Sequence, residues 1–233
     1  MTKPDAIPPA ANGVSWRHAT AAHAAHVYVI AEIGVNHDGD PRTAVQLVHA
    51  AADAKADAVK VQVFRAETLM SSASALAAYQ SKQGETDPRE MLRRLELTDE
   101  QLADVRDAAR QRGIGFIATP FSLSDIPRLD VLGVDAVKIA SPDAVNTPLL
   151  EAVGTLGKPL IISTGACDLD ELDHAAACVY DRGGALLHCV SAYPTPMDEA
   201  GLGGVAALRE RIGLPVGYSD HTTATHTGAL AVM

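Results

Sequence analysis

The sequence predicts a parallel α/β fold of the (βα)8 TIM-barrel type that ends after its seventh strand. Seven short runs rich in apolar and β-branched residues recur along the chain, and segments with helical periodicity separate most of them. Repeated strand–helix alternation implies parallel strands joined by right-handed crossovers. A doubly wound sheet is the competing fold, but no GxGxxG motif follows the first run.

The predicted strands share a nearly continuous apolar character, which is typical of strands buried on both faces. They cover residues 27–34, 57–64, 113–121, 135–141, 158–165, 185–191 and 214–220.

Helical patterns fill most of the intervals, at residues 43–56, 97–113, 147–157 and 168–183. The second of these begins with a capping-box pattern, in which Thr98 is the N-cap and Gln101 stands three residues later, and it ends at Gly113. The long interval between Leu69 and Leu97 predicts a surface excursion.

Length and composition indicate one folded domain. The chain has 233 residues, with 47% hydrophobic and 21% charged residues, and no linker divides it. We expect a flexible tail at residues 1–26 and an incomplete (βα)-barrel synthase domain at residues 27–233. No signal-peptide pattern or membrane-spanning apolar run occurs, so we expect a cytoplasmic protein with no membrane partner. The net charge of −10 argues against nucleic acid as a partner.

Polar residues recur where the predicted strands end, which is where a barrel of this type places its chemistry. The candidate residues are Glu32, Lys60, Gln62, Thr119, Lys138, Ser141, Ser191, Tyr193, Ser219, Asp220 and His221.

Lys60 and Lys138 each stand inside an apolar strand, as VKV and VKI. A buried ammonium needs a partner, and three interpretations remain open: lysine–carboxylate bridges, a bound phosphate and carboxylate, or a Schiff-base nucleophile. Glu32 is a candidate metal-adjacent group, hydroxyl acceptor or general base, or a salt-bridge partner of Lys60. His221 is either a metal ligand or a loop residue, and His37 in the turn NHDGD is equally open.

Several motifs together resemble the sialic acid synthase family, which includes N-acetylneuraminate, legionaminate and pseudaminate synthases and spore-coat polysaccharide enzymes. From about Val29 onwards they are IAEIGVNHDGD, ADAVKVQVFRAETL, EMLRRLELTDEQ, GIGFIATPFS, VDAVKIASPDAVNTPLL, GKPLIISTGA, LLHCVSAYPTP and GLPVGYSDHT. KIAS, STG, YPTP and GYSDHT are the most diagnostic. The chain departs from the family pattern at Pro142, Ala166 and Gly201, which bears on sugar specificity.

The resemblance implies condensation of phosphoenolpyruvate with an N-acetylated amino sugar resembling N-acetylmannosamine, to give a nonulosonic acid and phosphate. It implies a divalent Mn2+ or Mg2+ cofactor and allows a homodimer. Lys60, Lys138, Thr119, Ser141, Ser191 and Ser219 would hold phosphoenolpyruvate, Glu32, Gln62, Tyr193 and Asp220 would meet the sugar or the attacking water, and His221 would bind the metal. The alternatives are a non-catalytic truncated paralogue and a related synthase of the deoxyheptulosonate or deoxyoctulosonate type.

The family's eighth strand, its second metal-binding histidine and its C-terminal antifreeze-like domain have no counterpart in the 233 residues. Without an eighth strand, the strands at residues 27–34 and 214–220 would be exposed edges. We therefore expect self-association or low stability, and low activity, for the chain as it stands.

Overall fold

The computed structural model describes residues 27–69 and 87–233, and the chain divides into two compact units. One unit comprises residues 29–134, here called the N-terminal unit. The other, here called the C-terminal unit, comprises residues 135–233 with residues 27 and 28. The predicted tail at residues 1–26, and residues 70–86 of the predicted excursion, lie outside the described residues.

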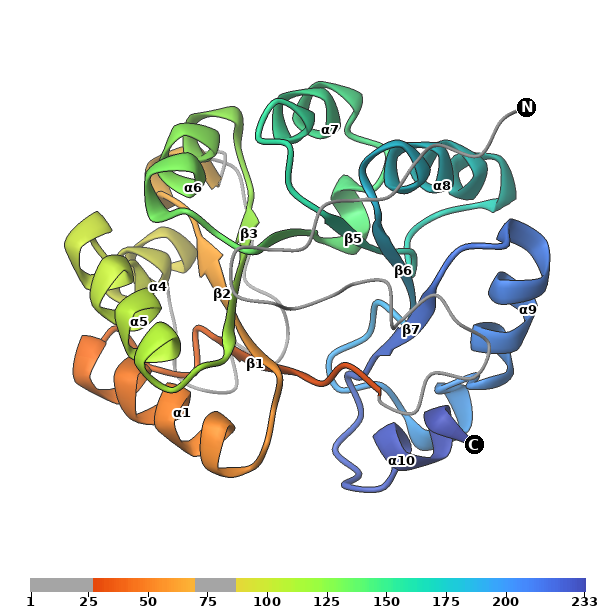
Figure 1. Ribbon diagram of the computed structural model, residues 1–233, viewed down its shortest axis with the longest axis horizontal. Helices are drawn as coiled ribbons and strands as arrows, with labels where there is room; N and C mark the ends of the chain where they lie inside the picture. The colour runs from red at the N-terminus through yellow and green to blue at the C-terminus, as the bar shows by residue number, and fades with distance from the viewer. Residues whose placement is uncertain (1–26, 70–86) are drawn as a thin grey trace. The chain divides into compact units, whose positions relative to one another are not determined.

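The N-terminal unit alternates strands and helices (Figure 1). Its elements are β1 (Ile30–Gly34), α1 (Pro41–Asp53), β2 (Ala58–Val63), α2 (Ala66–Leu69), α4 (Pro88–Leu95), α5 (Asp99–Gln111), β3 (Gly115–Pro120), η2 (Leu123–Asp125) and α6 (Ile126–Leu132). The three strands are parallel and neighbour each other in chain order. Lys60 is in register with Glu32 on one side, and Gln62 is in register with Thr119 on the other.

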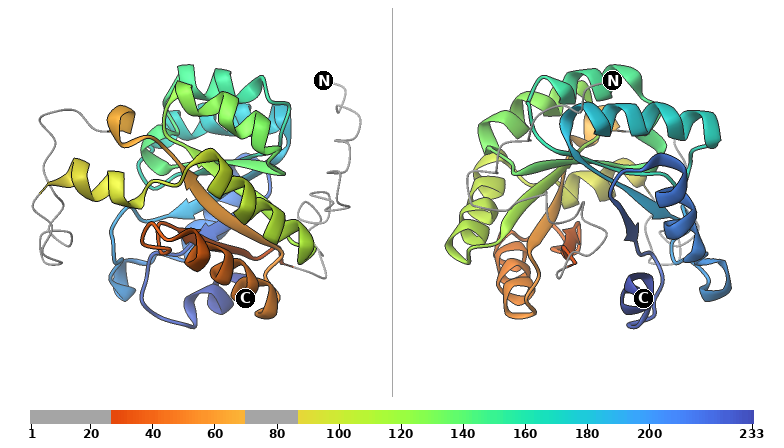
Figure 2. Two further views of the ribbon diagram at one scale, coloured as in Figure 1. Left: turned by 90° about the vertical axis from the view of Figure 1, so that its left-hand side faces the viewer. Right: turned by 45° about the vertical axis from the view of Figure 1, so that its right-hand side comes forward.

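The caps of the two long helices explain where they begin. Asp40 accepts a hydrogen bond from the Arg42 amide at 2.9 Å and so starts α1. The predicted capping box of α5 is confirmed: the Thr98 hydroxyl accepts from the Gln101 amide at 3.3 Å, and the Gln101 side chain accepts from the Thr98 amide at 2.8 Å. The two helices lie side by side (Figure 2).

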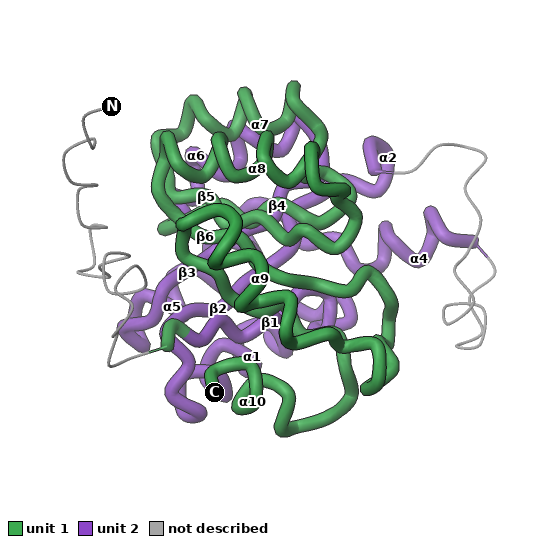
Figure 3. The backbone as a smooth tube through the Cα atoms, turned by 90° about the vertical axis from the view of Figure 1, so that its right-hand side faces the viewer, with its two compact units in different colours: residues 1–28, 135–233 green, residues 29–134 purple. Residues whose placement is uncertain are grey.

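The C-terminal unit continues the same alternation (Figure 3). Its elements are β4 (Ala136–Ile139), η3 (Ser141–Asp143), α7 (Thr147–Gly154), β5 (Leu160–Ser163), α8 (Leu169–Arg182), β6 (Gly184–Cys189), η4 (Met197–Glu199), α9 (Gly203–Ile212), β7 (Val216–Ser219) and α10 (Thr227–Val232). Strands β4 to β7 are parallel and also neighbour each other in chain order. The predicted parallel α/β class is therefore confirmed within each unit.

Burial differs between strands, which corrects the prediction that all of them are buried on both faces. Every residue of β3, β4 and β5 is buried, as expected for strands covered on both faces. In contrast, all four residues of β7 are half-buried, and β1 and β6 are only partly buried. The reason is local: among the described strands β1 pairs only with β2 and β7 only with β6, while β6 begins with the small residues Gly184 and Ala185.

The last part of the predicted surface excursion forms helix α4, which the sequence did not predict. Asp87 is its N-cap and accepts from the Arg89 amide at 2.8 Å, and Pro88 occupies the first turn. The apolar pattern missed this helix because it buries only Met91. No helix in residues 27–69 or 87–233 is long and apolar enough to cross a membrane.

Candidate active site

In the N-terminal unit, three predicted residues on the neighbouring strands β1, β2 and β3 contact one another. The Lys60 ammonium forms a salt bridge with the Glu32 carboxylate and donates to the Thr119 hydroxyl at 3.3 Å. The Lys60 side chain is 14% exposed and the Glu32 side chain 44% exposed. Of the interpretations left open for Glu32, the salt bridge to Lys60 is thus the one that the structure contains.

Strand geometry explains this arrangement. Alternate residues of a strand point to the same face, so Lys60 and Gln62 lie on one face of β2. Gly34 ends β1 with a positive φ of 28°, and a Cβ at this position would stand 2.5 Å from a Glu32 carboxylate oxygen. Glycine therefore leaves the space that the Glu32 side chain uses.

In the C-terminal unit, Lys138 is the most deeply buried charged residue of the predicted set, with 6% exposure. Its ammonium donates to the Ser163 hydroxyl and to the Ile139 carbonyl, both at 2.6 Å. The nearby Ser141 hydroxyl accepts from the Ala166 amide at 3.0 Å. The turn after β5 is thereby fixed beside the end of β4.

Gly165 brings this turn close to the end of β6. A Cβ at Gly165 would lie 2.6 Å from the Cys189 carbonyl oxygen and 2.8 Å from the Ser191 hydroxyl. Only glycine permits so close an approach without displacement of the backbone. Ser191, predicted to bind the substrate phosphate, therefore lies against the same turn.

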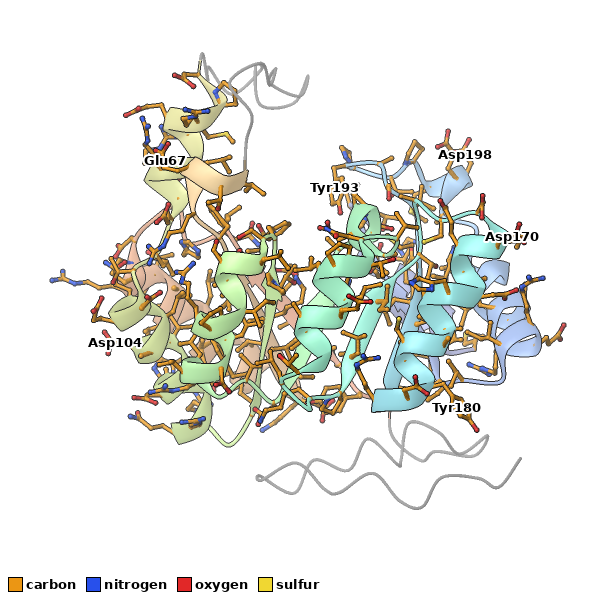
Figure 4. The ribbon with its side chains drawn as sticks, turned by 90° about the horizontal axis from the view of Figure 1, so that it is seen from above. Glu67, Asp104, Asp170, Tyr180, Tyr193 and Asp198 are labelled. Atoms are coloured by element: carbon orange, nitrogen blue, oxygen red, sulfur yellow. The ribbon has the colours of Figure 1, made fainter. Side chains whose placement is uncertain are left out.

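His221 and Tyr193 form a second group in this unit. His221 Nδ1 lies 2.8 Å from the Val190 carbonyl, which can only accept, so we assign the neutral-state proton to Nδ1. Nε2 then faces the Tyr193 hydroxyl at 3.1 Å and the Ser219 hydroxyl at 3.4 Å. The exposed Tyr193 stands on the loop after β6, labelled in Figure 4. Nε2 is thus the nitrogen whose lone pair can bind a ligand.

The pKa of His221 reflects two opposing causes. Burial lowers the pKa, but hydrogen bonds with Cys189 and with the Val190 carbonyl raise it above the usual value in sum. For the Cys189 thiol, whose sulfur lies 3.8 Å from Nδ1, burial raises the pKa, while the His221 hydrogen bond and the charges of His221 and Lys138 bring it below the usual value.

Asp220 lies next to His221 in the chain but is engaged with a different set of groups. It accepts hydrogen bonds from the Thr222 amide at 2.8 Å, from the Tyr218 hydroxyl at 3.3 Å and from the Thr227 hydroxyl. These contacts connect the end of β7 to the start of α10. Burial raises the pKa of Asp220, yet the hydrogen bonds lower it in sum, and the pKa of Tyr218 rises to about 12 through burial and the Asp220 charge.

Sequence reasoning gave no role to two residues that the structure places in these groups, Ser163 and Cys189. Ser163 is the hydroxyl partner of Lys138, and its only sequence signal is a polar residue at the end of an apolar strand. For His37, the structure favours a structural role over a catalytic one. The side chain is 2% exposed, and its Nδ1 accepts a hydrogen bond from the Gly39 amide at 3.1 Å. It shapes the turn after β1.

No group of three or more His, Cys, Asp or Glu side chains that could hold a metal ion occurs in residues 27–69 and 87–233. His221 Nε2 fits one position of a metal's ligand set, and the described part of the chain does not complete that set.

Fold and polar clusters define the class: a parallel α/β protein whose lysine-bearing strands end in hydroxyl-rich groups. The chain belongs to the NeuB family, whose family model matches residues 47–233. It is 40% identical over 214 residues to the N,N'-diacetyllegionaminic acid synthase of Legionella pneumophila, covering 88% of this chain and 60% of that protein. The chain therefore spans less than two thirds of this relative.

Two solved structures have a fold similar to that of this chain. A sialic acid synthetase from Leptospira borgpetersenii, crystallised with citrate, matches with a TM-score of 0.75 and 32% identity, over 88% of this chain and 69% of that one. A truncated 3-deoxy-D-arabino-heptulosonate 7-phosphate synthase from Thermotoga maritima matches with a TM-score of 0.61 and 14% identity, over 88% and 68%, and shows the fold alone. The predicted barrel-type α/β fold is thereby confirmed.

Proposed function

We propose that this chain carries out the condensation of phosphoenolpyruvate with an open-chain N-acetylated amino sugar, releasing phosphate and forming a nonulosonic acid. Membership of the NeuB family supports the reaction class. The observation that carries the proposal is Lys138, a buried ammonium held in place by the Ser163 hydroxyl and the Ile139 carbonyl.

This environment suits a small, highly charged acid. Water is largely excluded from Lys138, so its attraction for a phosphate or carboxylate is screened less than at the surface. Hydroxyl groups such as Ser141 and Ser163 can donate to anionic oxygens, and hydrogen bonds to ionised acceptors are stronger than neutral ones. Lys60, Thr119, Ser141, Ser191 and Ser219 are proposed to hold the same substrate.

The remaining residues are assigned to the acceptor and to water. Glu32, as a carboxylate, can accept a proton from a sugar hydroxyl or from water, and Gln62, Tyr193 and Asp220 are proposed to orient the sugar. C3 of phosphoenolpyruvate forms a bond to the aldehyde carbon, water adds at C2, and the tetrahedral intermediate expels phosphate. His221 is proposed to bind Mn2+ or Mg2+, which when bound would stabilise negative charge on the aldehyde oxygen.

The test is phosphate release by the purified 233-residue chain with Mn2+, phosphoenolpyruvate and a panel of acceptors. The panel contains N-acetylmannosamine, a sugar with two N-acetyl groups, erythrose 4-phosphate and arabinose 5-phosphate. We expect release only when an N-acetylated sugar is present, and none from the Lys138→Met variant. Release with a phosphorylated aldose alone would assign the chain to the deoxyheptulosonate or deoxyoctulosonate type. Phosphoenolpyruvate binding without release for any acceptor would indicate a non-catalytic protein.

A further inference from the structure

A buried carboxylate in the N-terminal unit organises the segment that follows β3. Asp125 is fully buried. One of its oxygens accepts from the Phe121 amide at 3.2 Å and from the amide and hydroxyl of Ser122, both at 2.9 Å. These contacts fix the backbone immediately after Pro120, the last residue of β3.

Arg128 extends this contact to two other segments. Its guanidinium pairs with the second Asp125 oxygen at 3.2 Å, donates to the Phe64 carbonyl at 3.2 Å and pairs with Asp99 at 2.6 Å. Phe64 directly follows β2, and Asp99 begins α5. One guanidinium, 10% exposed, therefore joins the exits of β2 and β3 to a helix start.

Aromatic packing reinforces the same junction, because the rings of Phe64 and Phe121 meet edge to face with centroids 6.3 Å apart. The junction is two residues from each of two candidate site residues. Thr119 precedes Phe121 by two residues and accepts from Lys60, and Gln62 precedes Phe64 by two residues. A shift of either strand exit would thus move the Thr119 hydroxyl relative to Lys60.

We propose that Asp125 and Arg128 are positioning residues. Their ion pair holds the exits of β2 and β3 so that the Thr119 hydroxyl and the Lys60 ammonium keep the orientation needed to bind phosphoenolpyruvate. This inference rests on the proposed function. A net gain in stability is a weaker explanation, because the desolvation of a buried ion pair offsets much of its attraction. Within the described residues, moreover, Arg128 Nη2 is buried without a hydrogen-bond partner.

The experiment compares Arg128→Met, Arg128→Lys and Ser122→Ala with a matched control, Arg106→Met, in the 233-residue chain. Like Arg128, Arg106 forms an ion pair, with Asp107, and donates to a backbone carbonyl, that of Leu132 at 3.5 Å. Neither of these interactions involves the exits of β2 and β3. Phosphoenolpyruvate affinity is measured by calorimetry, thermal midpoint by circular dichroism, and the Thr119 methyl signal by NMR.

We expect Arg128→Met to weaken phosphoenolpyruvate binding on the order of 10-fold, because the site is misaligned rather than removed. Arg128→Lys should recover part of the loss, since an ammonium can still pair with Asp125. Ser122→Ala, which removes the hydroxyl's hydrogen bonds with Asp125 and with the Ser124 hydroxyl 2.7 Å away, should weaken binding roughly threefold with the fold intact. Arg106→Met should bind within about twofold of the parent despite its own change in thermal midpoint.

Parent-like affinity in both Arg128→Met and Ser122→Ala would overturn the inference, as would equal losses in Arg128→Met and Arg106→Met. If Arg128→Met does not fold, Ser122→Ala decides. If the parent itself binds no phosphoenolpyruvate, the proposed function fails, and the Thr119 methyl signal tests positioning alone. A shift of that signal in the Arg128 or Ser122 variants but not in Arg106→Met supports it, and an unchanged signal in all of them overturns it.

Discussion

Lys60 and Lys138 occupy similar sequence settings, yet the structure surrounds them differently. Lys60 in the N-terminal unit faces the Glu32 carboxylate and a threonine hydroxyl. Lys138 in the C-terminal unit donates to a serine hydroxyl and a backbone carbonyl, both neutral acceptors. Lys138 is 6% exposed, whereas the Lys60 side chain is 14% exposed and the Glu32 side chain that faces it is 44% exposed.

The difference indicates two kinds of lysine site. An anionic ligand that approaches Lys60 has to share the ammonium with Glu32, and solvent screens part of the attraction. An anion that reaches Lys138 meets a charge in a drier environment, where electrostatic interactions are stronger. Substitution at the two positions should therefore have unequal effects on the binding of phosphoenolpyruvate.

The largest expected effect is that of Lys138→Met. Removal of the buried charge partner of an anion should weaken phosphoenolpyruvate binding by at least ~2 kcal/mol, about 30-fold in affinity. Calorimetry on the 233-residue chain measures this loss. Lys158→Met is the control, since Lys158 is only half-buried and precedes β5, at the other end of that strand from Ser163. Affinity equal to that of the parent would place the anion site elsewhere.

Smaller effects, of opposite sign, are expected at the Lys60 pair. Lys60→Met should weaken phosphoenolpyruvate binding by about 1 kcal/mol, because solvent screens this partly exposed site. Glu32→Gln should leave binding unchanged or tighten it up to about fivefold, since it removes the competing carboxylate while keeping the shape. The comparison is wrong if Glu32→Gln weakens binding more than Lys60→Met does in the same calorimetric series.

A third prediction concerns pH and stability in the N-terminal unit. Burial lowers the pKa of His37, although the Gly34 carbonyl and Asp38 act in the opposite direction. The folded protein therefore binds this proton less readily than the unfolded chain, whose histidine pKa is about 6.5. The stability that depends on a neutral His37 is fully present above the unfolded-state pKa. It is lost as the pH falls from there through the lower pKa of the folded state.

Urea titrations at pH 7.5 and 5.5 check this effect through the free energy of unfolding. The parent should lose more stability on acidification than His37→Gln, which cannot titrate. The exposed His226 supplies the control, because His226→Gln makes the same chemical change outside the buried turn after β1. Identical pH dependence of the parent and His37→Gln would show that His37 does not cause the loss of stability at low pH.

Local signals in the sequence predicted most of the fold. Apolar runs located all seven strands that residues 27–69 and 87–233 form, and the Thr98–Gln101 capping box placed the start of α5 correctly. Both signals depend on residues close together in the chain. Helix α4 was missed since it buries only Met91, which leaves almost no apolar periodicity to detect.

The candidate site was predictable in its residue types but not in its pairings. The sequence left the choice between a salt bridge and a catalytic role for Glu32 open, and it did not identify Ser163 as the partner of Lys138. Ser163 lies 25 residues from Lys138 in the chain, and the contact depends on how β4 and β5 are paired. Such a partner follows from the register between strands, which no short sequence motif contains.

The smallest expected effect is none at all: neither lysine should form a Schiff base. Iminium formation needs a neutral amine whose lone pair can attack a carbonyl carbon. The Lys138 nitrogen instead donates to Ser163 and Ile139, and the Lys60 nitrogen is engaged with Glu32 and Thr119. Borohydride treatment with pyruvate should therefore leave the intact mass unchanged, while a class I aldolase treated in parallel gains the adduct. An adduct that disappears in Lys138→Met or Lys60→Met would show that the lysine acts as a nucleophile, and the contrast between the two sites would then be one of reactivity rather than of charge.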